Sequence, residues 1–163
     1  MRTLCSASAT STAPPEAFFA RWADMDTWPE WDEAVVWSRL DGPFAAGTTG
    51  SLKPKGGPTV HFVIEILEPG TEFTDVSSMP GARLRIRHLA TVGGDGRTRV
   101  DIDVSIDGPL GWLWSRLIGA GIARSTPEGL RRLVELAEAD NVTLTDPDAN
   151  ADADANADAD PRP

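Results

Sequence analysis

Residues 108–139 of the 163-residue chain, GPLGWLWSRLIGAGIARSTPEGLRRLVELAEA, decide the fold that the sequence predicts. Apolar residues recur here at steps of three and four positions, which is the spacing of one face of an α-helix, and most charged residues fall outside that face. The positions on the apolar face are Leu110, Leu113, Trp114, Leu117, Ile118, Gly121, Ile122, Leu130, Leu133, Val134 and Ala137. Such a helix would be roughly 45 Å long at 1.5 Å per residue, and it needs a large apolar surface to pack on.

Residues 125–128 interrupt this helical pattern. Pro127 has no backbone N–H, and its ring clashes with the preceding turn of a helix. The same residues can start a new helix, because Thr126 is a good N-cap, Pro127 suits the first position and Glu128 favours a helix N-terminus. We therefore expect a kink or a brief break in the helix at this point.

The residues before the long helix read mainly as β-strands separated by turn signals rich in glycine and proline. The clearest pair is residues 82–92 and 99–107. One face of this pair is apolar apart from His88, and the other carries an arginine row opposite an aspartate row. Cross-strand ion pairs of that kind specify the register and contribute a few tenths to about 1 kcal/mol each. The weaker strand at residues 71–78 shows no pattern that assigns its two faces.

The N-terminal part predicts one strand and two short helices. Residues 2–10 are small and β-tolerant, a helix starts near Pro14 or Pro15, and a second helical turn spans residues 28–32. The order of strand, two short helices, six strands and a long helix indicates an α+β fold with an antiparallel sheet of about seven strands. A sheet of that size can curl around the helix and leave a cavity, where ligand pockets commonly form.

The distribution of charge predicts a folded domain at residues 1–139 and a tail at residues 140–163. The tail carries seven aspartates and one arginine, so it accounts for six of the ten net negative charges of the chain. Its segment 149–160 repeats the hexad ANADAD without a large apolar residue, which predicts disorder. The domain is only mildly acidic, and nothing in it resembles the basic surface of a nucleic-acid-binding protein.

The sequence gives three indications of where the protein works. Cys5 is the single cysteine, so no intrachain disulfide is possible, which fits a reducing compartment. The first residues contain no apolar run long enough for a signal peptide. No stretch reaches the eighteen apolar residues typical of a membrane span. We therefore expect a cytoplasmic protein without a membrane span.

Three stretches of the chain resemble one known family. They are PPEAFFARWADMDTWPEWDEAV (14–35), LDGPFAAGTTGSLKP (40–54) and GPLGWLWSRLIGAGIARSTPEGLRRLVELAE (108–138). Together they resemble START-like (SRPBCC) domains, and specifically the bacterial polyketide cyclase/dehydrase-like group. The resemblance covers residues 1–139. It implies a helix-grip fold, in which a curved sheet wraps around a long kinked C-terminal helix, with a hydrophobic cavity between them. It implies no particular reaction, because the family spans lipid carriers, cyclases and hormone receptors.

Such a cavity would be lined by the inward-facing residues of the sheet and the long helix. The predicted lining residues are Trp31, Phe62, Ile64, Leu84, Ile86, His88, Ile102, Val104, Trp114, Ile118 and Ile122. His88 is the only candidate for a catalytic residue, because a neutral histidine on the apolar face can hydrogen-bond a ligand or act as a general base. The alternative is a structural histidine bonded to backbone or water. His61 falls on the solvent face.

No metal or cofactor is predicted. The chain has no close set of histidines and cysteines and no glycine-rich loop for phosphates. Residues 146–150 begin a D-x-D-x-N calcium spacing, but the glycine and the final glutamate of a calcium loop are both alanine here. The acidic residues at positions 24–33 and the arginines at positions 83–87 are better explained as helix caps, solvated surface and cross-strand pairs.

Three functions follow from these observations. The first is a module that binds or carries a hydrophobic small molecule, lipid- or polyketide-like. The second is an enzyme of the cyclase or dehydrase type that acts on a ligand in the same cavity. The third is a structural or protein-interaction domain whose cavity is filled by its own side chains. The sequence leaves open whether a reaction is catalysed, and it does not set the oligomeric state.

Overall fold

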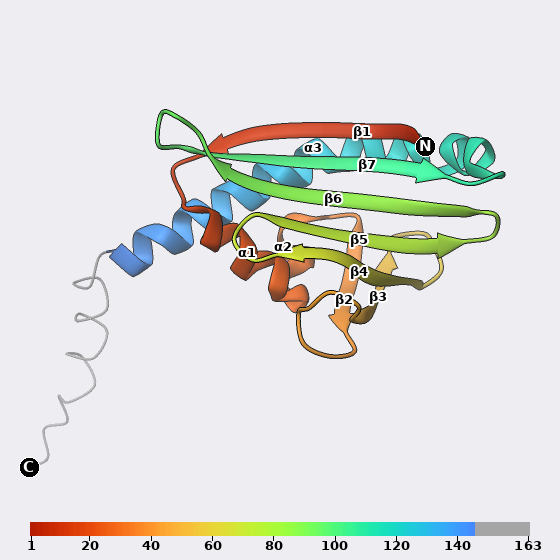
Figure 1. Cartoon of the computed structure of the whole chain (residues 1–163), viewed down its shortest axis with the longest axis horizontal. Helices are drawn as coiled ribbons and strands as arrows, with labels where there is room; N and C mark the ends of the chain where they lie inside the picture. The colour runs from red at the N-terminus through yellow and green to blue at the C-terminus, as the bar shows by residue number, and fades with distance from the viewer. Residues whose placement is uncertain (146–163) are drawn as a thin grey trace, which may run out of the picture.

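The computed structural model describes residues 1–145, with side chains as far as residue 143. These residues form a seven-stranded antiparallel sheet, short helices after the first strand, and one long final helix (Figure 1). The strands are β1 (Arg2–Ser11), β2 (Val35–Leu40), β3 (Thr49–Pro54), β4 (Val60–Glu68), β5 (Glu72–Met79), β6 (Ala82–Val92) and β7 (Thr98–Asp107). The helices are α1 (Pro15–Ala23), the single 3-10 turn η1 (Met25–Thr27), α2 (Trp28–Trp31) and α3 (Gly111–Thr145).

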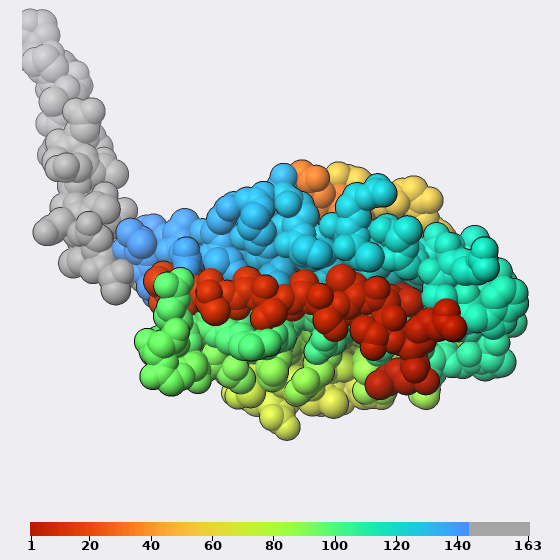
Figure 2. Space-filling view, turned by 90° about the horizontal axis from the view of Figure 1, so that it is seen from above, coloured from red at the N-terminus to blue at the C-terminus, as the bar shows by residue number. Residues whose placement is uncertain are grey.

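The strands lie in the order β1-β7-β6-β5-β4-β3-β2, so that β1 and β2 form the two edges. The sheet curves, and α3 runs along the edge strand β1 on the concave side (Figures 1 and 2). The helices α1 and α2 cover the same side nearer the other edge. This arrangement confirms the predicted α+β helix-grip fold. Among the described residues, no helix combines the length and apolar character that crossing a bilayer requires.

The register of β6 and β7 confirms the opposed arginine and aspartate rows, but the ion pairs differ from the expected ladder. Arg83 faces Asp107, and their side chains form an ion pair at 3.4 Å. Arg85 instead pairs with Glu65 of β4, and Arg87 pairs with Glu72 of β5 at 2.6 Å. Long arginine side chains therefore reach across neighbouring strands toward glutamates, which the pairing of β6 with β7 alone does not predict. These pairs lie on the outer face of the sheet.

The helix α3 is continuous from Gly111 to Thr145, with Pro127 inside it. The predicted break at residues 125–128 is therefore wrong, while a kink stays a prediction. Pro127 is exposed, as is Ala123 one turn earlier. Water can therefore satisfy the carbonyl that loses its helical donor at the proline, and the helix continues. The helix also extends past the domain boundary predicted at residue 139. The rest of the predicted tail, residues 146–163 with their calcium-like spacing, lies outside the described residues.

Both ends of α3 are held to the rest of the molecule. At its start, Leu110 N–H donates to the Gly81 carbonyl at 2.9 Å, and Trp114 Nε1 donates to the Pro80 carbonyl at 3.0 Å. Gly108 makes this approach possible, because its φ is +106° and a Cβ there would lie 2.6 Å from the Gly81 carbonyl oxygen. Farther along, Glu138 accepts hydrogen bonds from Ser11 Oγ and from the Thr12 backbone and hydroxyl groups. The helix is thus fixed to the β5–β6 turn and to the end of β1.

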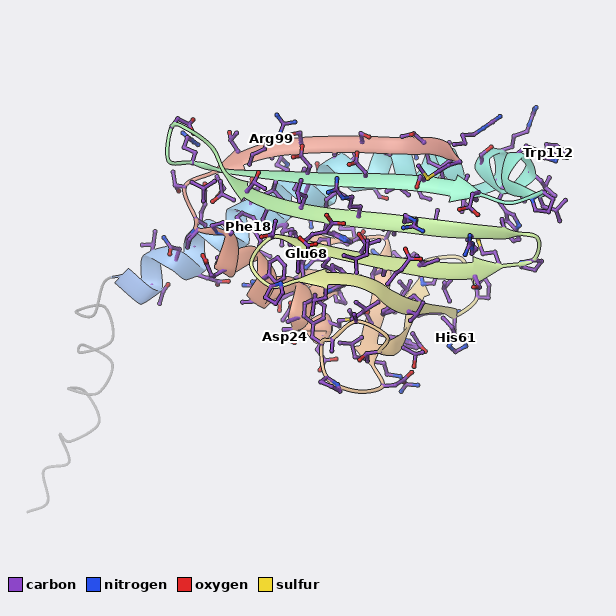
Figure 3. All side chains as sticks on the ribbon, viewed as in Figure 1. Phe18, Asp24, His61, Glu68, Arg99 and Trp112 are labelled. Atoms are coloured by element: carbon purple, nitrogen blue, oxygen red, sulfur yellow. The ribbon has the colours of Figure 1, made fainter. Side chains whose placement is uncertain are left out.

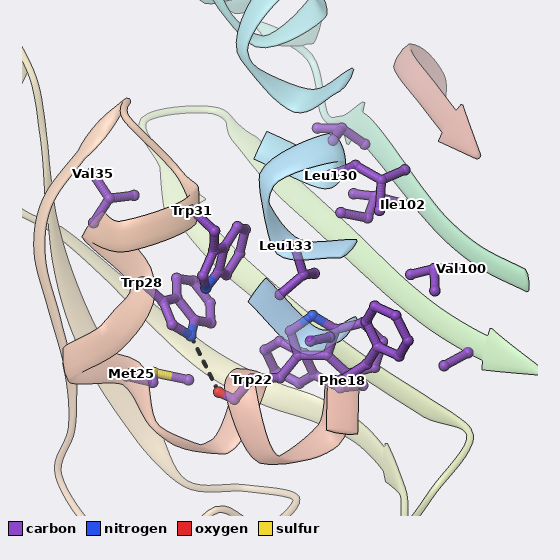
Figure 4. Packing of buried hydrophobic residues seen from close by; sticks show 14 of the residues in the cluster. Phe18, Trp22, Met25, Trp28, Trp31, Val35, Val100, Ile102, Leu130 and Leu133 are labelled. Atoms are coloured by element: carbon purple, nitrogen blue, oxygen red, sulfur yellow. Dashed lines mark hydrogen bonds between the residues drawn. The ribbon is translucent and has the colours of Figure 1, made fainter. Parts of the chain in front are cut away.

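The buried core gathers beneath α1, α2 and the second half of α3 (Figure 4). Its aromatic members are Phe18, Trp22, Trp28, Trp31, Phe62 and Phe73. The second half of α3 contributes Leu130, Leu133 and Ala137, all of them buried. Trp28 Nε1 donates to the Trp22 carbonyl at 3.2 Å, which joins α2 to the end of α1 (Figure 4). This end of the space between sheet and helix is filled by side chains of the protein itself.

Candidate functional site

The inner face of the sheet is defined by the pairing of its central strands. His88 of β6 lies opposite Ile102 of β7 on one side and opposite Phe73 of β5 on the other. Because side chains alternate along a strand, residues two positions away share this face. They are Leu84, Ile86 and Ala90 of β6, Val100, Val104 and Ile106 of β7, and Asp75 and Ser77 of β5. This face of the sheet is the concave side, on which α3 lies.

The residues predicted to line a cavity fall into two groups. Those that are buried are Trp31, Phe62, Ile64, His88, Ile102 and Val104. Those that are half-buried are Leu84, Ile86, Trp114, Ile118 and Ile122. The sheet members share the inner face, whereas Trp31 packs against Trp28 in the aromatic core, with 5.4 Å between ring centroids. The half-buried group is the one that the protein leaves partly uncovered, and its contact with a ligand stays a prediction.

His88 lies inside the aromatic core. Its ring is stacked on Phe73 at 4.7 Å between centroids, and Trp22 and Trp28 lie at 5.4 and 6.3 Å. Burial lowers the pKa of His88 from 6.5 to about 4, although a hydrogen bond with the Phe73 backbone partly opposes this effect. The ring is therefore neutral at physiological pH. It has the apolar surroundings of a structural histidine, and a base with so low a pKa is poorly matched to proton transfer near pH 7.

Asp75 of β5 is a second ionisable group on the inner face, and sequence analysis missed it. Its exposed fraction is 2%, and its Oδ1 atom has no hydrogen-bond partner in the protein. Burial raises the pKa of Asp75 from 3.8 to about 7, opposed only in part by a hydrogen bond from its own backbone. Near neutral pH this carboxyl group exists in both protonation states, so it can donate or accept a hydrogen bond.

The register of the β5–β6 hairpin contains the signal that would have located Asp75. Pro80 and Gly81 form a two-residue turn, so that Met79 pairs with Ala82. Counting back from that pair places Asp75 opposite Ile86, on the face that alternation had already identified as apolar. The sequence of β5 gives no such indication, because polar and apolar residues do not alternate along it. Both of its faces are buried, with Thr74 and Val76 on one and Asp75 and Ser77 on the other.

Four buried side-chain polar atoms have no hydrogen-bond partner among the described residues. They are Trp22 Nε1, Trp31 Nε1, Asp75 Oδ1 and His88 Nδ1. All four belong to residues of the inner face or of the helices that pack on it. Buried polar atoms are normally paired, and each unpaired one costs about 1–3 kcal/mol. Trp22, Trp31 and His88 belong to the filled aromatic core, whereas Asp75 lies opposite the half-buried Ile86. The Asp75 carboxyl group is therefore the one of the four nearest the half-buried apolar residues of β6.

The two halves of α3 differ in burial. No residue between positions 112 and 128 is buried, although this half carries several large apolar side chains. Its inward-facing members, Trp114, Ile118 and Ile122, are only half-buried. Beyond position 128 the helix is anchored in the core. The inner side of the first half of α3 is therefore only partly covered by the rest of the protein.

Two surface grooves lie outside this inner space. A groove of about 540 Å³ runs between β1 and the second half of α3. Its walls are Ser6, Ala7, Ser8, Ala9, Thr10, Pro127, Leu130, Arg131, Val134 and Glu135. A second groove of about 360 Å³ lies over the charged outer face of β1, β6 and β7. Neither is lined by a residue predicted to contact a ligand.

The other charged candidates have structural partners. Asp32 Oδ1 accepts a hydrogen bond from the Ala34 backbone, and burial raises the pKa of Asp32. Arg21 bridges Glu30 and Asp140 at 2.6 and 2.7 Å, which links α1 to α2 and α3. His61 lies beside Ser51, with 2.9 Å between Nδ1 and Oγ. Among the side chains that the structure describes, no three metal-ligating groups come together.

Comparisons with known proteins agree with this architecture. A family model described as "Polyketide cyclase / dehydrase and lipid transport" matches residues 2–138. No curated protein matches the chain. A hypothetical protein from Helicobacter pylori, jhp0584, is similar in structure with a TM-score of 0.65 at 12% identity, over 82% of this chain and 86% of that one. The Thermus thermophilus protein TTHA0849 has a TM-score of 0.64 at 16% identity, over 87% and 99%.

A further similar structure comes from a biosynthetic pathway. The di-domain ARO/CYC StfQ, from the steffimycin biosynthetic pathway, has a TM-score of 0.60 at 14% identity. The match covers 84% of this chain but only 45% of StfQ. At this level of identity the likeness shows a shared fold.

Proposed function

The chain belongs to the polyketide cyclase / dehydrase and lipid transport family, and from that premise we propose that it binds a hydrophobic small molecule between the inner face of the sheet and the first half of α3. The second half of α3 and the aromatic core close the other end of this space. A ligand would therefore lie beneath residues 114–122, against β6.

One observation carries this proposal. Trp114, Ile118 and Ile122 face inward from α3 yet stay half-buried, and Leu84 and Ile86 stay half-buried on the inner face of a central strand. Burying apolar surface contributes about 25 cal/mol per Å². A helix anchored at both ends above partly uncovered apolar side chains therefore offers a favourable surface to an apolar molecule.

The buried polar atoms indicate what else the ligand would contain. Asp75, which pairs with the half-buried Ile86, can accept a hydrogen bond when ionised and donate one when protonated, beside the apolar side chains of Leu84 and Ile86. A largely apolar molecule with a few hydroxyl or carbonyl groups, such as a polyketide-like compound, fits this combination. A pure hydrocarbon would leave the Asp75 oxygen unpaired.

A cyclase or dehydrase activity is the second candidate, and Asp75 is the residue that favours it. A general acid or base works best when its pKa lies near the working pH, and the Asp75 carboxyl group has a pKa of about 7. In such a reaction Asp75 would take a proton from a carbon next to a carbonyl group or return one to a leaving hydroxyl. His88, with its pKa of about 4, is less suited to that role.

Ligand binding can be tested with the apolar fluorescent probe N-phenyl-1-naphthylamine and two neighbouring substitutions. Ile118→Trp fills the proposed space from the inner side of α3, so we expect it to weaken probe binding at least about tenfold, equivalent to about 1.4 kcal/mol. Leu117→Trp adds the same side chain one residue away on the exposed side, and we expect no change. Fluorescence titration of the probe into each purified protein measures the two dissociation constants.

The two variants must retain the unfolding transition of the wild-type protein for the comparison to hold. Absence of saturable probe binding to the wild type, or equal weakening by Ile118→Trp and Leu117→Trp, would contradict binding beneath α3.

A further inference from the structure

Exposed apolar side chains collect at one end of the molecule, where the N-terminus meets the start of α3. The large apolar residues exposed there are Met1, Leu110, Trp112, Leu113 and Leu117, which we call the end patch. The described part of the chain exposes only three others, Val36, Val92 and Val142. Figure 2 shows the atoms of the N-terminus directly beside those of the first turns of α3, and Figure 3 shows Trp112 at the extreme end of the molecule. Contiguous exposed apolar surface of this kind marks an interaction site.

The periodicity of α3 accounts for the exposure. Residues 114, 115, 118, 119 and 122 are half-buried and face the body of the protein. The positions between them form the outer side of the helix, and all are exposed: Trp112, Leu113, Arg116, Leu117, Ala120 and Arg124. Trp112 is 56% exposed and Leu117 is 65% exposed, so neither contributes much to the core. The first half of α3 is therefore apolar on two sides, of which only the inner side faces the sheet.

Three arginines at the N-terminus and on the first half of α3, Arg2, Arg116 and Arg124, make no ion pair among the described residues. Neither Arg116 nor Arg124 makes an ion pair or a side-chain hydrogen bond within the described part of the chain, and Arg2 donates only to Ser115 Oγ, at 3.3 Å. Residues 108–127 contain no aspartate or glutamate, in a chain that has 25 of them.

The second half of α3 is different. Arg131 pairs with Glu128 and Glu135, and Arg132 pairs with Glu33 at 2.6 Å. Unpaired positive charge on this helix is thus confined to the half that also exposes apolar residues.

We propose that the end patch docks the protein on an anionic lipid surface. The side chains of Trp112, Leu113 and Leu117 enter the boundary between headgroups and acyl chains, while Arg2, Arg116 and Arg124 lie against lipid phosphates. An exposed helix side that combines tryptophan and leucine with arginine, and lacks acidic residues, is the pattern of interfacial helices.

The positive charge near the end patch favours a lipid surface over a second copy of the chain as its partner. In a two-fold symmetric dimer the same patch meets itself, so that the unpaired arginines of both copies would lie in one interface and repel. Anionic headgroups supply the missing counter-charge instead. The net charge of −10 on the chain opposes approach to such a surface, so the attraction must come from this local patch.

This docking does not depend on what binds beneath α3. The probe test above uses no lipid surface, and the test below uses no internal ligand, so each proposal can fail while the other stands. If both hold, the half of α3 that borders the ligand space also rests on the membrane.

Co-sedimentation of the full chain with lipid vesicles at about 0.1 M salt tests the proposal. Vesicles of mixed phosphatidylcholine and phosphatidylglycerol should bind the wild-type protein, and vesicles of phosphatidylcholine alone should bind it at least about tenfold more weakly. Leu113→Ser with Leu117→Ser should weaken binding to the mixed vesicles about tenfold or more, and so should Arg116→Gln with Arg124→Gln. Val36→Ser and Arg131→Gln, which change an exposed valine and a paired arginine elsewhere, should leave it unchanged.

Sedimentation equilibrium without lipid identifies the competing occupant. A monomer that binds the mixed vesicles supports the proposal. Three results would overturn it: no binding to mixed vesicles, equal binding by all the variants, or self-association that the leucine substitutions abolish while vesicle binding is absent. Because the substituted side chains are exposed, unchanged thermal unfolding of each variant confirms that it is folded.

Discussion

Replacing Asp75 with asparagine is expected to raise the free energy of unfolding by about 2–4 kcal/mol at pH 8 and to leave it nearly unchanged at pH 4. The pKa of this buried carboxyl group is about 7 in the folded protein against 3.8 for an ordinary aspartate. As the pH rises between these two values, the unfolded chain releases a proton that the folded protein retains. Stability is therefore lost over this window, and the full loss of about 4 kcal/mol is present above pH 7.

Asparagine has no charge to bury, so the variant avoids most of this loss, although its amide still lies among apolar groups. Chemical denaturation at a series of pH values from 4 to 8 measures the difference between variant and wild type. Asp26→Asn removes an exposed carboxyl group and serves as the control. A difference between Asp75→Asn and the wild type that stays constant with pH would show that Asp75 does not hold its proton into the neutral range.

Replacing Trp22 with alanine is expected to destabilise the protein by about 3–5 kcal/mol. Trp22 is completely buried in α1, and its ring contacts Phe18, Phe19, Phe73 and His88. Its removal leaves a cavity at the centre of the aromatic core that these neighbours can fill only in part. Trp112→Ala removes the same side chain from an exposed position on α3 and should change the free energy of unfolding by less than about 0.5 kcal/mol.

The same substitution should change the titration of His88. The pKa of His88 is about 4 because the ring is buried, and Trp22 is one of the rings that enclose it. We expect the pKa to rise toward 6.5, which NMR can follow because the chain contains only two histidines. If His88 titrates near pH 4 in both proteins, the aromatic enclosure is not the cause of its low pKa.

Elements with a clear local pattern could be predicted from the sequence. The alternation of β6 and β7 placed His88 on the inner face, and the structure confirms that face. The three- and four-residue spacing identified α3. The turn signals separated the strands, so that the order of elements and the antiparallel sheet are confirmed as well. In each case the residues that determine the structure are neighbours in the sequence.

Features that depend on distant residues could not be predicted. Of the kink or brief break predicted at Pro127, the break is wrong, because a local rule takes no account of the exposure that lets water bond the freed carbonyl there. The face of Asp75 is set by pairing through the β5–β6 turn, whereas β5 itself shows no alternation. The enclosure of His88 requires Trp22 from α1. These two residues are more than sixty positions apart in the sequence, and no local pattern predicts that they are in contact.

The most direct test of ligand binding beneath α3 is methyl NMR of the isoleucine side chains during titration with N-phenyl-1-naphthylamine. We expect saturable shifts of Ile86, Ile118 and Ile122, which border the proposed site, with smaller changes at Ile106, buried on the inner face of β7. Ile118→Trp should abolish these shifts. Saturable binding that leaves Ile86, Ile118 and Ile122 unmoved would contradict a site between the sheet and the first half of α3.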